Sequence, residues 1–327
     1  ALGTSYSTNN LPMIPMYMYY SMFGFQRIGD IAWAAGDSQA QGFLCGATAG
    51  RTTLNGEGLQ HQDGHSHLLA ATIPNCVAYD PCFGYELAVI IHDGLQRMYV
   101  NQERVFYYLT LMNENYDQPA LPQEAVEGIK KGLYLFEQDE KATVQLIGSG
   151  VILREVIKAA QILKDEYQIH ANVWSATSFN ELARDGMAVE EYNRLHPLED
   201  GKESWVSQQL RGTDGIVVAA TDHMRAYSEQ IRAYLPDNRP YVTLGTDGYG
   251  RSDTRGNLRS YFGVDAAHIV VATLKKLADE GEVDARLVKD AISTFELDVD
   301  RPVAWLPQAH PSVQDVAAYA EPTEENK

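Results

Sequence analysis

Lysine is absent from the first 121 residues of this 327-residue chain, although the rest of the chain contains all ten lysines. The same segment carries ten tyrosines, ten acidic residues and only four arginines. Lysine is a common covering residue of solvated surfaces and is depleted at interfaces, where tyrosine is enriched. We therefore expect residues 1–121 to be largely buried against something else, and the remaining residues to form a conventionally exposed domain.

Basic residues are also scarce overall, because 26 Lys and Arg stand against 44 Asp and Glu, which gives a net charge of -18. A phosphate surface repels such a chain, so we expect neither a nucleic acid nor a membrane as a partner. Three cysteines without a CxxC pattern are too few for a disulfide framework, which favours a cytoplasmic location. The longest apolar run, residues 11–25, contains two prolines and is too short to span a bilayer as a helix.

Short β-branched or aromatic runs alternate with segments of helical periodicity, which indicates an α/β fold with a mostly parallel sheet. The polar stretch that follows residue 112 and extends to about residue 130 is interpreted as an interdomain linker. The expected strands cover residues 14–20, 76–79, 105–112, 143–147, 170–175, 215–220 and 241–244. The expected helices cover residues 83–99, a segment after Gly150 that includes residues 152–163, a segment from Ser178 that Gly186 closes, and residues 266–280 and 285–294.

A glycine-rich segment, residues 56–67, contains three of the nine histidines and two carboxylates; we call it the histidine loop. Its glycines let backbone approach a ligand closely, and imidazole titrates near neutral pH. Three roles are open: catalysis or substrate binding, structural hydrogen bonding, and metal binding through His61, Asp63, His65 and His67. We favour the first role and assign no metal ligand, because the sequence contains no second ligand cluster that completes an obvious site.

The apolar run of residues 11–25 is rich in aromatic side chains, and plain core packing is the simplest explanation for them. Alternation along a strand, however, places Tyr17 and Tyr19 on one face and Tyr20 on the other, so one face must pack on something other than its own helix. Together with the histidine loop, this run indicates a cofactor site, or half of one, for a flat heteroaromatic ring.

Two further glycine-rich segments, residues 148–150 and 244–253, are interpreted as structural turns. The first follows an expected strand and precedes an expected helix, where backbone N–H groups attract anions. Position 153 is leucine, so the full GxGxxG pattern of a dinucleotide loop is missing. A tight turn between strand and helix is therefore the better interpretation.

Residues 4–15, 19–30, 50–61 and 244–253 closely resemble the homodimeric bacterial pyruvate dehydrogenase family. The resemblance covers roughly residues 1–305 and implies a transketolase-like architecture that holds thiamine diphosphate at a dimer interface. By resemblance, residues 1–121 are the latter part of a pyrimidine-binding domain and residues 122–305 are a carboxy-terminal domain. Residues 306–327 are expected to form an acidic tail. The chain looks like only the carboxy-terminal part of such an enzyme.

The resemblance also implies roles for individual residues. Phe23 is expected to stack on the aminopyrimidine of the cofactor, with Tyr20 beside it. His61 resembles the active-site histidine of the family, and His67 is similar to a substrate-contacting histidine of transketolases. The glutamate that activates the cofactor is expected before Ala1, and the ligands of the diphosphate and Mg²⁺ are expected outside this chain.

The implied function is thiamine-diphosphate-dependent oxidative decarboxylation of pyruvate with reductive acetylation of a lipoyl group. The implied partners are the amino-terminal part of the same enzyme, a second copy in a homodimer and the lipoyl acetyltransferase component. Two alternatives stay open: a noncatalytic regulatory or assembly subunit with the same fold, and a metal hydrolase built on the histidine loop. The retention of His61 and Phe23 favours the enzyme.

Overall fold

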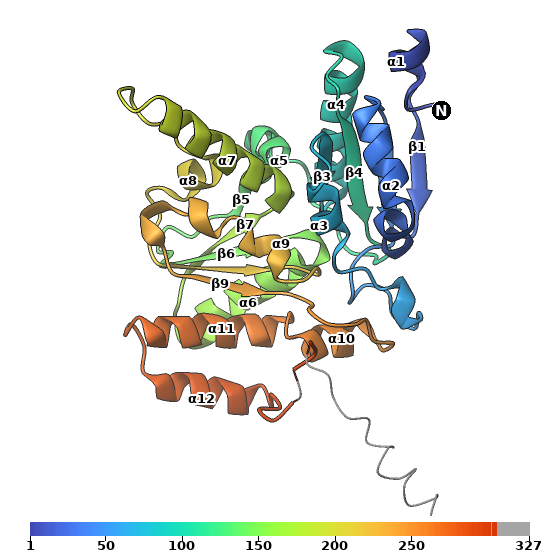
Figure 1. Ribbon diagram of the computed structural model, residues 1–327. Coiled ribbons are helices and arrows are strands. Elements are labelled where there is room, and N and C mark those ends of the chain that lie inside the picture. Colours follow the sequence, from blue (N-terminus) through green and yellow to red (C-terminus); the bar gives the residue numbers. More distant parts are fainter. Residues whose placement is uncertain (302, 306–327) are drawn as a thin grey trace, which may run out of the picture.

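The computed structural model describes residues 1–301 and 303–305, so the expected acidic tail lies outside the described residues. Two sheets with helices on their faces lie side by side (Figure 1). The prediction of an α/β fold with mostly parallel strands is confirmed. In the part of the chain that the structure describes, no helix is long and apolar enough to cross a membrane.

The first sheet has four parallel strands in the order β1-β2-β4-β3. Every residue of β3 and nearly every residue of β4 is buried, as in parallel sheets covered on both faces. The strands are β1 (Met16–Tyr19), β2 (Phe43–Ala47), β3 (Cys76–Tyr79) and β4 (Phe106–Leu111). The helices of this part are α1 (Ser5–Asn9), α2 (Gly24–Asp37), α3 (Ser66–Ala71), α4 (Gly84–Leu95) and α5 (Val126–Lys131).

The second sheet has five strands in the order β5-β7-β6-β8-β9, and only β5 runs antiparallel to its neighbour. The strands are β5 (Tyr134–Glu137), β6 (Val144–Gly148), β7 (Ala171–Ser175), β8 (Ile216–Ala220) and β9 (Tyr241–Leu244). The helices are α6 (Leu153–Tyr167), α7 (Phe179–Leu195), α8 (Trp205–Leu210), α9 (Ala226–Glu229), α10 (Arg255–Phe262), α11 (Ala266–Asp279) and α12 (Ala285–Thr294).

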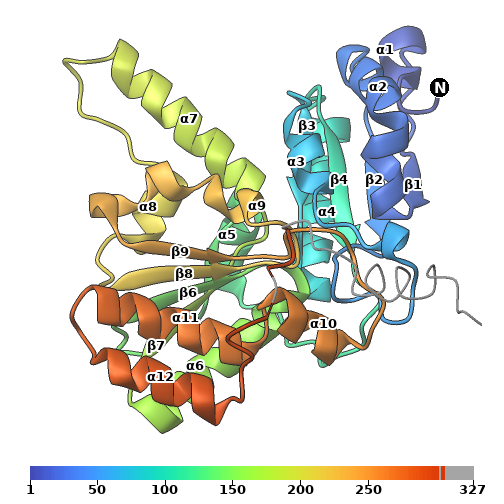
Figure 2. The same cartoon turned by 60° about the horizontal axis from the view of Figure 1, so that its bottom comes forward.

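The core of the second sheet has two layers, because helices cover both of its faces (Figure 2). Helices α6 and α11 pack Val156, Leu163 and Leu274 on one face. Helices α7, α8 and α9 pack on the opposite face, where Phe179 and Tyr227 are fully buried. The junction with the first sheet is formed partly by α3, which contacts both α7 and α9.

Three local expectations differ from the structure. Strands β2 and β5 were not expected, and the presumed linker already contains α5. Gly186 does not end its helix, because α7 continues to Leu195. A side chain at position 186 would collide with the ring of Tyr234, so this glycine serves close packing rather than helix termination.

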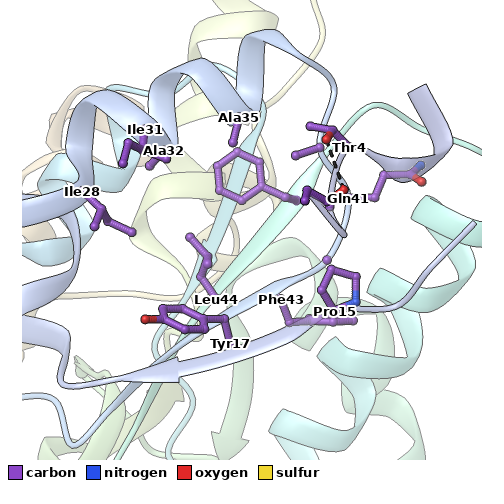
Figure 3. A pocket seen from close by; sticks show the side chains of 15 residues that line it. Thr4, Pro15, Tyr17, Ile28, Ile31, Ala32, Ala35, Gln41, Phe43 and Leu44 are labelled. Atoms are coloured by element: carbon purple, nitrogen blue, oxygen red, sulfur yellow. Dashed lines mark hydrogen bonds between the residues drawn. The ribbon is translucent and has the colours of Figure 1, made fainter. Parts of the chain in front are cut away.

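Edge strand β1 and helix α2 expose an unusual amount of apolar surface. The side chain of Met18 is 71% exposed, and an apolar cavity of about 210 Å³ opens between these elements (Figure 3). Tyr17, Ile28 and Leu44 line it. We use the name β1–α2 face for this exposed edge as a whole, although alternation along β1 places Tyr17 on the opposite side of the sheet from Met16 and Met18. Its exposed apolar side chains are Met13, Ile14, Met16, Tyr17, Met18, Ile31 and Trp33.

Candidate active site

Three aromatic rings converge where the chain leaves β1. The backbone turns through a short 3₁₀ segment, Ser21–Phe23, directly into α2. Gly24 permits this turn, since a side chain there would overlap the ring of Tyr19. The centroid of the His61 ring lies 5.3 Å from that of Tyr20 and 5.0 Å from that of Phe23, both in edge-to-face geometry. The structure therefore brings together three of the four residues singled out in the sequence.

His61 ends a 3₁₀ segment, Leu59–His61, within the histidine loop. Its side chain is 25% exposed, and its Nδ1 atom is buried without a hydrogen-bond partner among the described residues. The nearest carboxylate oxygen, Glu57 Oε2, is 3.9 Å from that nitrogen, which is too far for a hydrogen bond. The imidazole is thus close to solvent and retains a free ring nitrogen.

The rest of the ring cluster is open. Tyr20 is 51% exposed, so its ring is available to a flat ligand. The guanidinium of Arg27 lies 4.2 Å from the centroid of the Phe23 ring, in cation–π geometry. These contacts fix the ring of Phe23 beside His61 and place a positive charge next to it.

The 244–253 segment, which starts at the end of β9, contacts the histidine loop. Gln62 accepts a hydrogen bond at Oε1 from the backbone N–H of Arg251, at 2.6 Å, and donates from Nε2 to the carbonyl of Leu54, at 3.0 Å. Gly250 allows this approach, because a Cβ there would lie 2.7 Å from the Gln62 Oε1 atom and from the carbonyl oxygen of Leu59. The glycine-rich segment 244–253 therefore supports the loop that carries His61.

Asp63, which was considered as a metal ligand, instead organises the start of α3. Its Oδ1 atom accepts hydrogen bonds from the backbone N–H groups of His65 and Ser66, each at 3.0 Å, and the Ser66 hydroxyl donates to Oδ2. The Tyr108 hydroxyl donates to Ser66 Oγ at 2.8 Å. Burial opposes the charge of Asp63, but His223 and these hydrogen bonds lower its pKa.

His67 lies in a different environment, fully buried in α3. Its ring stacks on Tyr227, with centroids 4.7 Å apart, and meets the ring of His223 edge-on at 4.8 Å. Its Nε2 atom is 3.0 Å from Thr110 Oγ1. Burial lowers the pKa of His67 to about 3, so its ring is neutral at physiological pH. Contact between His67 and a substrate stays a prediction.

Around His67 lies a group of fully buried titratable side chains, which we call the buried histidine cluster: His67, Asp80 and His223. Asp80 follows β3, and His223 follows β8, so the carboxyl ends of strands from both sheets meet here. Asp80 accepts hydrogen bonds from Thr110 at 2.6 Å and from Ser149 at 2.9 Å.

The sequence reasoning missed Asp80 and His223. Both follow strands that it located correctly, and polar side chains at the carboxyl ends of parallel strands are a general signal of a site. Burial opposes ionisation of Asp80, but the His223 imidazole and the hydrogen bonds lower its pKa to about 2. Burial acts to lower the pKa of His223, but Asp80 and the other nearby carboxylates raise it.

Comparison with solved structures identifies the fold. The transketolase of Campylobacter jejuni superposes with a TM-score of 0.61 at 16% identity, over 84% of this chain and 37% of that chain. A chain described as a split gene transketolase, inactive beta4 tetramer, superposes with a TM-score of 0.60 at 17% identity, over 84% of this chain and 80% of that chain. The two sheets thus have the transketolase-like fold.

Comparison of sequences narrows the class. Residues 1–119 match the pyruvate dehydrogenase E1 component middle domain, and residues 132–265 match the transketolase-like C-terminal domain. The chain is 59% identical over 304 residues to the pyruvate dehydrogenase E1 component of Pseudomonas aeruginosa and 58% identical to that of Escherichia coli. These alignments cover 92% of this chain and 34% of each relative. The chain is thus similar to pyruvate dehydrogenase E1 components and spans about a third of the length of these relatives.

Proposed function

We propose that this chain forms one side of the active site of a thiamine-diphosphate-dependent pyruvate dehydrogenase, the decarboxylating component of a multienzyme complex. The observation that carries the proposal is the convergence of Tyr20, Phe23 and His61 at a partly open surface, in a chain with 58–59% identity to named E1 components. A noncatalytic subunit with the same fold is less favoured, because the half-exposed ring of Tyr20 and the partly exposed ring of His61 contribute little to a packed core.

The ring cluster fits the aminopyrimidine of thiamine diphosphate. An exposed phenol and a partly exposed phenyl ring offer π-faces to a flat heterocycle, and such stacking contributes about 0.5–1.5 kcal/mol for each ring pair beyond area burial. When bound, the cofactor supplies the electron sink that decarboxylation of a 2-oxo acid requires. We propose that Phe23 stacks on the pyrimidine and that Tyr20 lies beside it. The diphosphate and Mg²⁺ are proposed to bind residues outside this chain.

His61 is the proposed catalytic residue. In its neutral form, the imidazole has one N–H donor and one acceptor nitrogen. The donor can hold the carboxylate of the 2-oxo acid, and the acceptor can take a proton from the substrate side of the site. The unpaired Nδ1 atom supports this role, because it shows that at least one ring nitrogen of His61 has no hydrogen bond to the described part of the protein. Gln62 and the 244–253 segment support the backbone on both sides of His61.

The partners are proposed on surface grounds. We propose that the β1–α2 face packs on the remainder of the same enzyme, because an edge strand with adjacent exposed apolar side chains is rarely left in solvent.

The division into parts 1–121 and 122–305 is supported by the two sheets and by the two family matches. A second copy and a lipoyl acetyltransferase complete the proposed complex. Three buried free thiols support a cytoplasmic setting.

The proposal is tested by Phe23→Ala in the complete enzyme that carries this chain. Loss of the stacked ring is expected to weaken thiamine diphosphate binding by about 10-fold, as roughly 1.4 kcal/mol is lost. Binding is measured by titration of the cofactor followed by intrinsic fluorescence or calorimetry, with thermal unfolding measured in parallel.

The matched control is Tyr192→Ala, which removes an aromatic side chain from α7, where it stacks on His196 rather than on the ring cluster. This variant is expected to bind the cofactor as the unchanged enzyme does. Equal cofactor affinity in the Phe23→Ala and unchanged enzymes, with both folded, would contradict the assignment of Phe23.

A further inference from the structure

The buried histidine cluster has the composition of a metal site. It contains two imidazoles and a carboxylate, and one ligand atom from each of His67, Asp80 and His223 lies within 4.8 Å of the others. All three side chains are fully buried. Two histidines and one carboxylate form a common ligand set for Zn²⁺ and other divalent first-row metals.

Unsatisfied ring nitrogens provide a second, independent observation. Among the described residues, Nδ1 of His67 and both ring nitrogens of His223 lack a hydrogen-bond partner, although His223 Nε2 lies within ion-pair distance of Asp80. Leaving a buried polar atom unpaired costs about 1–3 kcal/mol, so three such atoms in one place require an explanation. A cation bound by one nitrogen of each ring would satisfy two of these three atoms, since the two nitrogens of a single imidazole point away from each other.

The distances agree with this explanation. His223 Nε2 lies 3.5 Å from Asp80 Oδ1, beyond the range of a good N–H···O bond. Metal–ligand bonds of about 2.1 Å in a tetrahedral site place neighbouring ligand atoms roughly 3.4 Å apart. The pair therefore already has the separation that a shared zinc ion would impose. The His67 ligand atom lies within 4.8 Å of the other two and would have to meet the same separation to complete a three-ligand set.

The surroundings suit a buried metal site. Thr110 and Ser149 donate hydrogen bonds to the Asp80 carboxylate and orient it, which is the usual outer-shell arrangement around a ligating carboxylate. The hydroxyl of Thr110 also lies 3.0 Å from His67 Nε2. The ligands come from α3, from the end of β3 and from the end of β8, so an ion here would connect the two sheets.

We propose that His67, Asp80 and His223 bind one divalent transition-metal ion, with Zn²⁺ as the probe and a water molecule in the fourth coordination position, at a buried site between the two sheets. The site is separate from the His61 cluster and from the Mg²⁺ expected at the cofactor diphosphate. It also differs from the loop site considered in the sequence, because it takes only His67 from the histidine loop. The rival state is a metal-free ion pair between protonated His223 and Asp80.

The test uses the complete enzyme produced with zinc in the medium, and the same enzyme refolded from denaturant with and without Zn²⁺, because a buried site loads during folding. After gel filtration in a weak chelator, metal content is measured by plasma mass spectrometry. One zinc per chain is expected in the zinc-loaded samples. A zinc content below a tenth of an equivalent per chain in all samples would overturn the proposal in favour of the metal-free ion pair.

Two variants locate the ion. His223→Gln is expected to remove the bound zinc, whereas His170→Gln is expected to retain it, since His170 pairs with Asp139 elsewhere on the second sheet. His65→Gln is also expected to retain it, because His65 is not in the cluster. Loss of zinc in His65→Gln, with retention in His223→Gln, would refute the assigned ligands.

A spectroscopic measurement keeps the proposal testable if His223→Gln fails to fold. Refolding the unchanged enzyme with Co²⁺ in place of Zn²⁺ is expected to give the intense visible bands of four-coordinate cobalt, which added Zn²⁺ abolishes when both ions compete during folding. Absence of these bands in a correctly folded enzyme would refute the site. Neither outcome depends on thiamine diphosphate, so the proposed function is tested separately.

Discussion

At the residue scale, the turn between β6 and α6 shows how one glycine adapts to a neighbouring charge. Gly150 has φ of +51°, and an added Cβ would lie 2.7 Å from an oxygen of the Asp80 carboxylate. The backbone N–H of Gly150 donates to the carbonyl oxygen of Asp80 at 3.0 Å. The turn resembles an anion-binding loop in sequence, and in the structure Asp80 of the same chain lies against it.

We expect Gly150→Ala to destabilise the protein by about 2–4 kcal/mol, because the left-handed backbone is strained for alanine and the new methyl group meets a buried carboxylate. The free energy of unfolding from urea titration measures the effect. Gly29→Ala is the matched control in α2, where no atom lies within 4 Å of the added Cβ, and it should stabilise by about 0.5–1 kcal/mol. Equal effects of the two substitutions would contradict this account.

Some residues of the site could be predicted from the sequence and others could not. The roles expected for His61, Phe23 and Tyr20 came from a resemblance, and their rings lie together in the structure. Local patterns alone could not establish this contact, because nearly forty residues separate Phe23 from His61. The pairing of Asp80 with His223 was not predicted, since it depends on how two separate sheets pack.

At the element scale, the polar segment after β4 is tied down by ion pairs instead of acting as a free linker. Glu114 lies 2.6 Å from Arg154 on α6 and also pairs with Arg259 on α10. Arg259 is nearly buried and has a second partner in Glu155, 3.3 Å away. Burial acts to raise the pKa of Glu114, but the hydrogen bonds and charges of Arg259 and Arg154 lower it.

We expect Glu114→Gln to lower the free energy of unfolding at neutral pH by about 3 kcal/mol, because it leaves the largely buried Arg259 short of a counter-charge. The folded pKa of Glu114 is depressed, so its contribution is complete above the unfolded value of about 4.3 and is lost as pH falls through the folded pKa. Urea titrations from neutral to acidic pH should therefore show the two proteins converging in acid.

Glu191→Gln provides the comparison for this ion pair. Glu191 pairs with Arg194 on the exposed surface of α7, where solvent screens the interaction, and no measurable change in stability is expected at any pH. A difference between Glu114→Gln and the unchanged protein that does not shrink in acid would show that lost packing, rather than lost charge, causes the destabilisation.

Elements were predictable where their residues carried the signal locally. Strands β8 and β9 begin with β-branched or aromatic residues and lie where expected. Strand β2 was missed because Phe43–Ala47 includes glycine, alanine and cysteine, and it is a strand through pairing with β1 and β4 on both sides. The helix end expected at Gly186 was wrong because the glycine accommodates Tyr234, which is nearly fifty residues away.

At the scale of the whole molecule, the first 121 residues combine a buried sheet with the exposed β1–α2 face. The absence of lysine in this segment, noted from the sequence, coincides with exposed apolar side chains on β1 and α2 rather than with complete burial. A charge placed on this face would have to be buried when the remainder of the enzyme covers it.

We expect Met18→Lys to lower the thermal midpoint of the complete enzyme, because the ammonium group is desolvated where the β1–α2 face is covered, at a cost of roughly 1–3 kcal/mol. The measurement is differential scanning calorimetry of the complete enzyme. Met187→Lys is the control, since Met187 is 53% exposed on α7, and it should leave the midpoint unchanged. Equal midpoints for the two variants would argue that the β1–α2 face stays in solvent.

The clasp between Gln62 and Arg251 has a bearing on protein engineering. Because the loop that carries His61 is held by a backbone N–H almost two hundred residues downstream, the two segments are structurally coupled. A hybrid enzyme that takes residues 56–67 from one bacterium and residues 244–253 from another would tilt the imidazole unless both pieces were exchanged together.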